Sequence, residues 1–216
     1  MVRFNNVSHS YKMKNKLNNV LVDVNFSVEK GQKVGIIGSN GSGKSTLLRL
    51  FGGVEEPTSG KIERMMSVSW PLAFGGAFQG SLSGLDNTRF ICRVYNKHLK
   101  GAEKYMLDFT ELEDFLYEPV KTYSSGMRAR LAFGISMLVD FDCYLIDEIT
   151  AVGDAKFQEK CNYELFEKRK DRSMLIVSHD ESLIKRSCDS VIILNKGNAS
   201  THTDIDKAYL EYAEQS

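Results

Sequence analysis

The sequence predicts an α/β fold, built on a mostly parallel β-sheet with a smaller antiparallel β-layer beside it. Two observations predict the parallel sheet: short apolar runs alternate with segments of helical periodicity, and a glycine-rich loop joins one such run to a helix. A third observation predicts the antiparallel layer. Apolar and polar residues alternate over residues 20–28, as in a strand with only one buried face.

The glycine-rich loop has the most specific pattern in the chain. Its sequence, Gly38-Ser39-Asn40-Gly41-Ser42-Gly43-Lys44-Ser45, matches the phosphate-binding loop G-x-x-x-x-G-K-[ST], with a strand before it and a helix after it. Glycines let successive N–H groups point at phosphate oxygens, and a helix start adds further donors. Lys44 is expected to reach the β- and γ-phosphates, and Ser45 to ligate Mg²⁺. We therefore predict a P-loop NTPase core; the alternative is a chance match.

Composition excludes several classes of protein. Hydrophobic residues make up 42% of the 216 residues and charged residues 26%, which is typical of a globular protein with a proper core. Lys and Arg balance Asp and Glu at 28 each, so no nucleic-acid partner is expected. No apolar stretch approaches the roughly 20 residues that span a bilayer. The four cysteines lack metal or redox spacing and are expected to be reduced.

The remaining elements follow from periodicity and turn residues. We expect residues 1–70 and 140–216 to form the core and about 85–139 a helical subdomain, all within one domain. The expected elements are strands near 1–9, 20–28 and 33–37, a helix over 44–51, short strands near 61–70, a loop over 71–84, helices over about 85–117 and 126–139, a strand at 142–147, a helix at 155–170, a strand at 173–178, a helix at 181–187, two strands within 189–203 and a helix from about 204.

Two carboxylates stand at the end of the apolar run 142–147: Asp147 is its last residue, and Glu148 follows it. In open α/β sheets, the carboxyl ends of parallel strands face the crevice that binds ligands. Asp147 is expected to hold Mg²⁺, directly or through water, and Glu148 to accept a proton from the attacking water or to orient it. The alternative is a pair of solvated acids at a strand end.

Two further segments are candidate phosphate contacts. His179 follows the apolar run 174–177 and could hydrogen-bond a γ-phosphate, or it could simply cap the next helix. The segment Tyr123-Ser124-Ser125-Gly126-Met127 places hydroxyls and a glycine at a helix start, which is either a second anion site or an ordinary serine cap. The other histidines, His9, His98 and His202, are expected at the surface.

The order of these motifs resembles the nucleotide-binding domain of ABC transporters along the whole chain. The resemblance implies a RecA-like core with a helical signature subdomain, and ATP contacts from Tyr11, stacked on adenine, and from the loop. The implied loop contacts are Gly38, Ser39, Asn40, Gly41, Ser42, Gly43, Lys44, Ser45 and Thr46. The resemblance also implies a homodimer. In this dimer the ATP bound by the partner is contacted by Ser124, Ser125, Gly126 and Met127, and the partner itself is contacted by Gly153 and Asp154.

Several segments narrow the resemblance to the ATPase subunit of Gram-negative capsular polysaccharide exporters. They are Ser69-Trp70-Pro71-Leu72, residues 75–84, residues 121–128 and residues 147–154, which end in an Ala-Val-Gly-Asp loop. This implies an ATP hydrolase with Glu148 and His179 as catalytic residues, attached to the cytoplasmic face of the inner membrane. A permease subunit is expected to dock near residues 71–84. The polysaccharide itself is not expected to contact this subunit.

The sequence departs from the family pattern in two places. The signature segment, usually Leu-Ser-Gly-Gly-Gln, keeps only Ser124 and Gly126 of the five positions. The family's Mg²⁺-ligating glutamine is absent near Pro71, and Gln79 is a weak substitute for it.

Four alternatives stay open from the sequence. Exporters of O-antigen or teichoic acid share the Ala-Val-Gly-Asp loop, and soluble ABC ATPases share the motifs. A P-loop GTPase would use Asn195-Lys196-Gly197-Asn198 for guanine, although Asn198 replaces the required carboxylate. A regulatory subunit without catalysis is disfavoured because Glu148 and His179 are both present.

Overall fold

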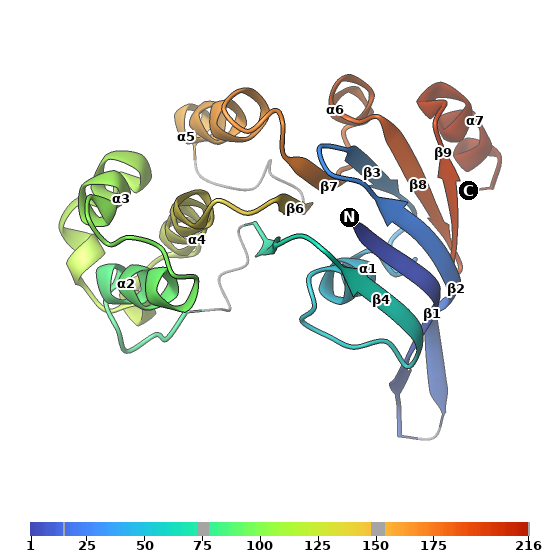
Figure 1. The fold of residues 1–216 in the computed structure, drawn as a ribbon, viewed down its shortest axis with the longest axis horizontal. Helices are drawn as coiled ribbons and strands as arrows, with labels where there is room; N and C mark the ends of the chain where they lie inside the picture. The colour runs from blue at the N-terminus through green and yellow to red at the C-terminus, as the bar shows by residue number, and fades with distance from the viewer. Residues whose placement is uncertain (15, 73–77, 148–153, 216) are drawn as a thin grey trace. The chain divides into compact units, whose positions relative to one another are not determined.

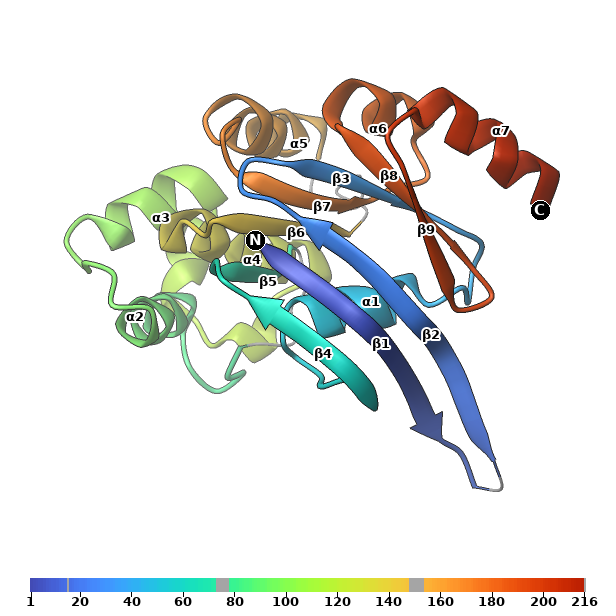
Figure 2. The same ribbon diagram turned by 45° about the vertical axis from the view of Figure 1, so that its right-hand side comes forward.

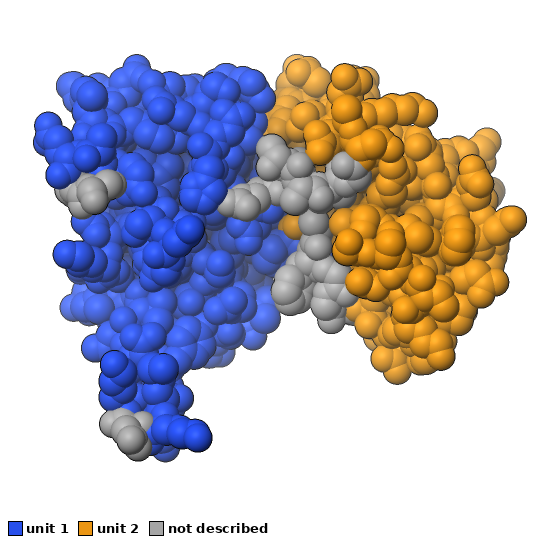
Figure 3. Space-filling view, turned by 180° about the vertical axis from the view of Figure 1, so that it is seen from behind, with its two compact units in different colours: residues 1–71, 142–148, 171–216 blue, residues 72–141, 149–170 orange. Residues whose placement is uncertain are grey.

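The computed structural model describes residues 1–14, 16–72, 78–147 and 154–215. The chain divides into two compact units, coloured separately in Figure 3. Unit 1 comprises Met1–Pro71, Asp142–Glu148 and Asp171–Ser216, and unit 2 comprises Leu72–Phe141 and Ile149–Lys170. Each unit has its own buried core.

The main sheet of unit 1 has six strands in the order β5-β6-β7-β3-β8-β9. The first five are parallel and β9 is antiparallel to β8, which confirms the predicted mostly parallel sheet. The carboxyl ends of β6, β7 and β3 therefore lie side by side along one edge (Figure 1). The strands are β3 (Lys33–Ile37), β5 (Val68–Pro71), β6 (Cys143–Asp147), β7 (Ser173–Val177), β8 (Ser190–Asn195) and β9 (Asn198–His202).

The predicted antiparallel layer is a separate sheet of three strands, in the order β2-β1-β4 (Figure 2). Its strands are β1 (Val2–Lys12), β2 (Leu17–Val28) and β4 (Ser59–Arg64). The first two are longer than the expected strands near 1–9 and 20–28, because β1 continues to Lys12 and β2 begins at Leu17. Polar cross-strand contacts extend the ladder: the Ser10 hydroxyl donates to the Asn19 side chain at 2.7 Å.

An irregular register changes which face of β2 is buried. The sequence alternation predicted a buried face at Val20, Val22, Val24, Phe26 and Val28. The prediction is correct for Val24, Phe26 and Val28 and wrong for Val22. In the structure Leu21 is fully buried, whereas Val22 is 37% exposed. Asp23 has a φ of 47°, and the β1–β2 register shifts near this point. A single extra residue in a strand moves the following side chains to the opposite face, which explains the error.

The core of unit 1 lies between the three-stranded layer, helix α1 (Lys44–Phe51) and the main sheet. Three phenylalanines join these layers. Phe4 stacks on Phe26 with ring centroids 4.4 Å apart, and Phe51 stands 5.9 Å from Phe4 and 6.3 Å from Phe26. Their packing holds the C-terminal end of α1, the helix whose N-terminal end follows the glycine-rich loop.

Two helices pack near the C-terminal strands. Helix α6 (Glu181–Ser187) follows β7, and α7 (Ile205–Gln215) packs on β8 and β9 (Figure 1). The Lys185 ammonium of α6 lies 2.5 Å from Asp206 of α7 and 2.7 Å from Glu181. The contact with Asp206 joins α7 to α6, and the contact with Glu181 lies within α6.

Unit 2 is helical. It contains α2 (Gly84–Val94), α3 (Ala102–Thr110), α4 (Ser125–Val139) and α5 (Ala155–Asn162), with short helices η2 (Glu113–Tyr117) and η3 (Val120–Thr122) and a π-helical segment, η5 (Tyr163–Glu167). Helix α4 is buried on most of its sides, as expected of a central helix. At Gly134 a Cβ atom would lie 2.7 Å from Thr110, so glycine permits the close approach of α3 and α4.

One part of the expected division is wrong. The sequence analysis placed residues 155–170 in the core, but they belong to unit 2. The Phe157 ring packs edge-on against Phe109 and Phe133, with centroids 5.6 and 6.3 Å away. The Lys160 ammonium donates to the carbonyl of Asp108 at 2.6 Å. These contacts bind α5 to α3 and α4, and local periodicity does not reveal them.

None of the described helices, in either unit, is long and apolar enough to cross a membrane.

Candidate nucleotide-binding site

The glycine-rich loop has the backbone that its sequence requires. Gly41 and Gly43 have φ values of 81° and 109°, in the region that favours glycine. At Gly38 a Cβ atom would lie 2.5 Å from the Leu194 carbonyl oxygen and 2.6 Å from the Ser42 hydroxyl. The loop is therefore tightly packed, its conformation requires glycine at positions 41 and 43, and a residue larger than glycine does not fit at Gly38.

Helix α1 begins directly after this loop. Gly43 occupies its N-cap and supplies no side-chain hydrogen bond, and the first turn contains no acidic residue. The N–H groups of a helix's first turn have no partner within the helix, and with the positive end of the helix dipole they favour an anion at this position. The Lys44 ammonium donates to the carbonyl oxygens of Gly38 and Ser39 at 2.7 and 2.9 Å, so this cation lies against the loop.

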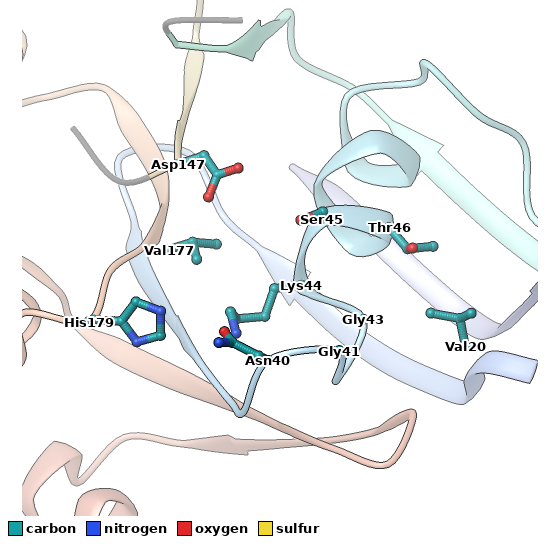
Figure 4. Close-up of a pocket in the computed structure, with 10 residues that line it drawn as sticks. All are labelled: Val20, Asn40, Gly41, Gly43, Lys44, Ser45, Thr46, Asp147, Val177 and His179. Carbon is teal, nitrogen blue, oxygen red and sulfur yellow. The ribbon is translucent and has the colours of Figure 1, made fainter. Parts of the chain in front are cut away.

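A pocket of about 370 Å³ opens at this helix start (Figure 4). Eight of its ten lining residues were predicted from the sequence, and they come from the loop, from α1 and from the ends of β6 and β7. Val20 and Val177 were not predicted, because their place depends on how β2 and β7 meet the loop. The lining residues are Val20, Asn40, Gly41, Gly43, Lys44, Ser45, Thr46, Asp147, Val177 and His179.

The donor atoms in the pocket fit a magnesium ion. The Ser45 hydroxyl and the Asp147 carboxylate supply hard oxygen ligands, which Mg²⁺ prefers, and this ion normally keeps waters and substrate phosphates as its other ligands. Among the described residues, no group of three or more His, Cys, Asp or Glu side chains could hold a metal.

His179 lies at the rim of the same pocket, after β7. The alternative role considered for it, capping the following helix, is wrong. The N-cap of α6 is Asp180, whose carboxylate accepts hydrogen bonds from the N–H groups of Ser182 and Leu183 at 2.9 and 3.2 Å. His179 is exposed, and its imidazole lines the pocket (Figure 4).

Tyr11 stands beside the pocket without lining it. Its hydroxyl donates to Glu55 at 2.6 Å and lies 3.3 Å from the hydroxyl of Thr46, which does line the pocket. The ring is partly exposed. The predicted stacking of this ring on adenine stays a prediction.

The signature segment (Ser124–Met127) begins helix α4 in unit 2. Ser124 is the N-cap, and its hydroxyl accepts from the Met127 N–H at 3.2 Å. Ser124 and Ser125 are exposed, and the first turn of α4 has no acidic residue. Ser124 therefore caps the helix, as the simpler reading expected. This does not exclude an anion site, since other N–H groups of the first turn remain.

The other predicted residues differ in how far the structure describes them. Asp154 is the N-cap of α5 and accepts from the Phe157 N–H at 2.9 Å. Gln79 belongs to unit 2 and is exposed, with its backbone bonded to the Asn87 side chain. Glu148 and Gly153 lie outside the described residues, as do residues 73–77 of the loop expected to dock the permease.

The sequence profile of the family described as "ABC transporter" matches residues 21–151, more than half of the chain. The chain belongs to the ABC transporter family. In this chain the phosphate loop, Asp147 at the end of β6 and His179 after β7 line one pocket.

Full-length relatives agree with this assignment. The chain is 58% identical to the ATP-binding protein BexA of Haemophilus influenzae, over 99% of both chains. It is 57% identical to the capsule polysaccharide export ATP-binding protein CtrD of Neisseria meningitidis, over 98% of both chains. The polysialic acid transport ATP-binding protein KpsT of Escherichia coli is 45% identical, over 98% of both chains.

Solved structures share the ABC ATPase fold. The dimeric ATP-binding cassette MJ0796 in a post-hydrolysis state, bound to ADP and Pi, has a TM-score of 0.78 at 24% identity, covering 94% of this chain and 98% of that one. The ATP-binding subunit of an ABC transporter has a TM-score of 0.77 at 24% identity, covering 100% and 95%. At this level of identity they show the fold alone.

The guanine-binding alternative is wrong for this ABC protein. Residues Asn195–Asn198 form the tight turn of the β8–β9 hairpin, in which Asn195 pairs with Asn198. Lys196 and Gly197 have φ values of 48° and 86°, as a two-residue hairpin turn requires. The Gly197 carbonyl accepts from Val22 N–H at 2.9 Å. Through this hydrogen bond the turn contacts β2, and the turn residues are not among those that line the pocket.

Proposed function

We propose that this protein is the ATP-hydrolysing subunit of an ABC exporter for capsular polysaccharide. The observation that carries the proposal is the match over 98% of both chains, at 57% identity, to a protein named for capsule polysaccharide export. The pocket supports the ATPase part of the proposal, since Lys44, Ser45, Asp147 and His179, four of the side chains proposed to act on the phosphates and Mg²⁺, line it. The two units together would form one ATPase domain.

In the proposed reaction the loop and Lys44 bind the β- and γ-phosphates, so that positive charge faces the bond to be broken. Ser45 and Asp147 would hold Mg²⁺, which neutralises phosphate charge when bound. Glu148 would accept a proton from the attacking water or orient it, and His179 would hydrogen-bond the γ-phosphate. The exposed position of His179 at the pocket rim supports this role.

We propose that two copies act together as a homodimer. Ser124–Met127 of one copy would face the phosphate loop of the other, and Gly153 and Asp154 would contact the partner. Exposed hydroxyls at the start of α4 support this arrangement, and the structural relative MJ0796 is described as dimeric. ATP would bind both faces and so favour the closed dimer, and its hydrolysis would let the dimer open.

We further propose that the protein works at the cytoplasmic face of the inner membrane, bound to a permease subunit that docks near residues 71–84. Dimer closure would then move the permease, and the polysaccharide would pass without contacting this subunit. The exporter names of CtrD and KpsT support this part of the proposal. Gln79 in the docking loop would at most assist Mg²⁺ binding.

Hydrolysis and dimer formation can be tested with purified protein. Lys44→Ala should reduce Mg-ATP hydrolysis by about 100-fold or more, as expected when a main phosphate contact is lost, whereas Lys104→Ala on α3 should not change it. Glu148→Gln should still bind ATP and accumulate as an ATP-dependent dimer in size-exclusion chromatography with light scattering. A Glu148→Gln variant that stays monomeric at saturating Mg-ATP would refute the dimer mechanism.

The cargo needs a cellular test. The gene is deleted in its host and complemented with wild type or Lys44→Ala, and surface polysaccharides are extracted and typed. We expect the deletion strain to lose its capsule, and we expect the wild-type gene, but not Lys44→Ala, to restore it. Loss of O-antigen or teichoic acid with normal capsule would assign the other glycan, and normal surface glycans would favour a soluble ABC ATPase.

A further inference from the structure

Beside the phosphate loop, three polar side chains from separate segments form a closed ring of two hydrogen bonds and one ion pair. Tyr11 belongs to β1, Arg49 to α1, and Glu55 to the turn after α1. The Tyr11 hydroxyl donates to Glu55 Oε2 at 2.6 Å, Arg49 Nη2 donates to the Tyr11 oxygen at 2.8 Å, and Arg49 Nε lies 2.8 Å from Glu55 Oε1. Every member contacts both others, so the ring fixes all three side chains.

The geometry also settles which atom donates to which. A tyrosine hydroxyl has one proton, and the short contact to the Glu55 carboxylate uses it. The oxygen of Tyr11 then accepts from Arg49 and, at 3.3 Å, from the hydroxyl of Thr46. Thr46 is therefore a donor to this ring. The hydrogen bond to Tyr11 raises the pKa of Arg49 although burial opposes it, as expected for a cation held by this ring.

A buried histidine supports the other side of the tyrosine. His9, expected at the surface, is only 8% exposed. Its ring stands edge-on to that of Tyr11, with centroids 4.8 Å apart and an angle of 81°, and its Nε2 lies 3.5 Å from Glu55. The Tyr11 ring is thus held by its hydroxyl at one end and by an aromatic neighbour on one side.

Thr46 connects this ring to the phosphate pocket. It lines the pocket next to Ser45, and it is 5% exposed. The network therefore ties a partly exposed aromatic side chain to the start of α1, where the phosphates are proposed to bind. An aromatic ring at a set distance from a phosphate site is suited to stacking a nucleobase. A ring that is held in place before binding loses less entropy when the base arrives.

We infer that Arg49 and Glu55 are positioning residues for the nucleobase of the bound nucleoside triphosphate. They hold Tyr11 against the start of α1, so that one ligand engages the ring through its base and the loop through its phosphates. The inference rests on the proposed function, because it requires a nucleoside triphosphate in the pocket. It separates base binding from phosphate binding, and these two can be measured independently.

The experiment compares two ligands, ATP and inorganic triphosphate, each with Mg²⁺, by isothermal titration calorimetry. Glu55→Gln removes one acceptor of the ring, and Tyr11→Phe keeps the aromatic ring but removes its hydroxyl. Glu63→Gln is the matched control, since Glu63 also pairs with a basic residue and its side chain is 29% exposed, as that of Glu55 is. Thermal unfolding of each variant checks the fold.

Glu55→Gln and Tyr11→Phe should each weaken ATP binding by about three- to tenfold, the usual effect of one hydrogen bond. Triphosphate binding should change by less than about twofold, and Glu63→Gln should change neither affinity. Equal loss for both ligands, or no loss for ATP, would overturn the inference alone. A wild-type protein that binds neither ligand would overturn the proposed function as well. Should Glu55→Gln fail to fold, Tyr11→Phe decides.

Discussion

Arg130 and Asp154 form an ion pair, with the guanidinium Nη2 lying 2.9 Å from a carboxylate oxygen. The pair joins helix α4, which begins with the signature segment, to the start of α5. The other carboxylate oxygen of Asp154 accepts from the Phe157 N–H, and Arg130 lies over the Phe157 ring, 4.5 Å from its centroid. The two elements proposed to face a second copy are therefore joined within one unit.

Replacing Asp154 should separate its two roles. Asp154→Ala loses both the helix cap and the ion pair, and it should lower the midpoint of thermal unfolding by about 2–4 °C. Asp154→Asn keeps a good cap and loses the charge, so its midpoint should fall less, since exposed ion pairs contribute little. Differential scanning calorimetry measures both. An asparagine variant as unstable as the alanine variant would show that the ion pair dominates.

Gly38→Ala should impair nucleotide binding because the added Cβ would meet the Leu194 carbonyl and the Ser42 hydroxyl at 2.5 and 2.6 Å. Relieving this clash must move the loop, so we expect affinity for Mg-ATP to fall at least about tenfold, or ~1.4 kcal/mol. Calorimetric titration gives the affinity.

Gly126→Ala is the matched glycine control for the fold. The nearest atom to a Cβ at Gly126 is the Ser124 hydroxyl, 3.9 Å away, and the residue lies in the first turn of α4. Its free energy of unfolding should be unchanged or raised by up to about 1 kcal/mol. If Gly38→Ala binds ATP as wild type does, the tight packing described for the loop is wrong.

The pocket was predictable from the sequence because its chemistry is encoded locally. The glycines at 41 and 43 are needed for backbone angles, and Asp147 and His179 each follow an apolar strand. Parallel strands place their carboxyl ends along one edge, so local motifs far apart in the chain converge. The strand order, with β7 between β6 and β3, was not predicted from the sequence.

The errors arose where distant contacts decide the outcome. His9 packs against Tyr11, two residues further along β1, and lies near Glu55, which is distant in the sequence and follows α1. The bulge at Asp23 exchanges Val22 for Leu21 in the core without changing the local pattern. The apolar face of helix α5 could pack against either unit as far as its sequence shows. The contacts of Phe157 with Phe109 and Phe133 place it in unit 2.

Stability should depend on pH through Asp142, whose carboxylate accepts from the N–H and the hydroxyl of Ser67 at 2.9 and 2.8 Å. The backbone hydrogen bond, with smaller help from the hydroxyl, lowers the pKa of Asp142 below the ordinary value of about 3.9. The unfolded chain then binds the proton more readily. The stabilisation of the folded state by the charged Asp142 carboxylate is therefore complete above about pH 3.9, and it is lost as the pH falls through the folded-state pKa.

Asp142→Asn should therefore cost about 1 kcal/mol at neutral pH, allowing for partial exposure of the side chain. The difference from wild type should shrink as the pH falls below about 3.9. Urea unfolding at several pH values measures it, and Asp171→Asn, at an exposed aspartate of the same unit, should show no such trend. A constant difference at all pH values would mean that the charge of Asp142 contributes nothing.

Phe51 should be essential to the core that holds α1. It is fully buried and packs on Phe4 and Phe26, which belong to two strands of the antiparallel sheet. Phe51→Ala removes this bridge and leaves a cavity, so the free energy of unfolding should fall by about 3–5 kcal/mol. Phe51→Leu, which refills most of the volume, should cost roughly 1–1.5 kcal/mol.

Phe90→Ala is the control, because the Phe90 side chain on α2 is 58% exposed and its removal should cost no more than about 0.5 kcal/mol. Urea unfolding followed by circular dichroism gives all three values. Since α1 carries Lys44 and Ser45 at its other end, Phe51→Ala should also weaken Mg-ATP binding, while Phe90→Ala should not. Equal losses of stability for Phe51→Ala and Phe90→Ala would contradict the layered core, because a buried bridging ring cannot be as dispensable as an exposed one.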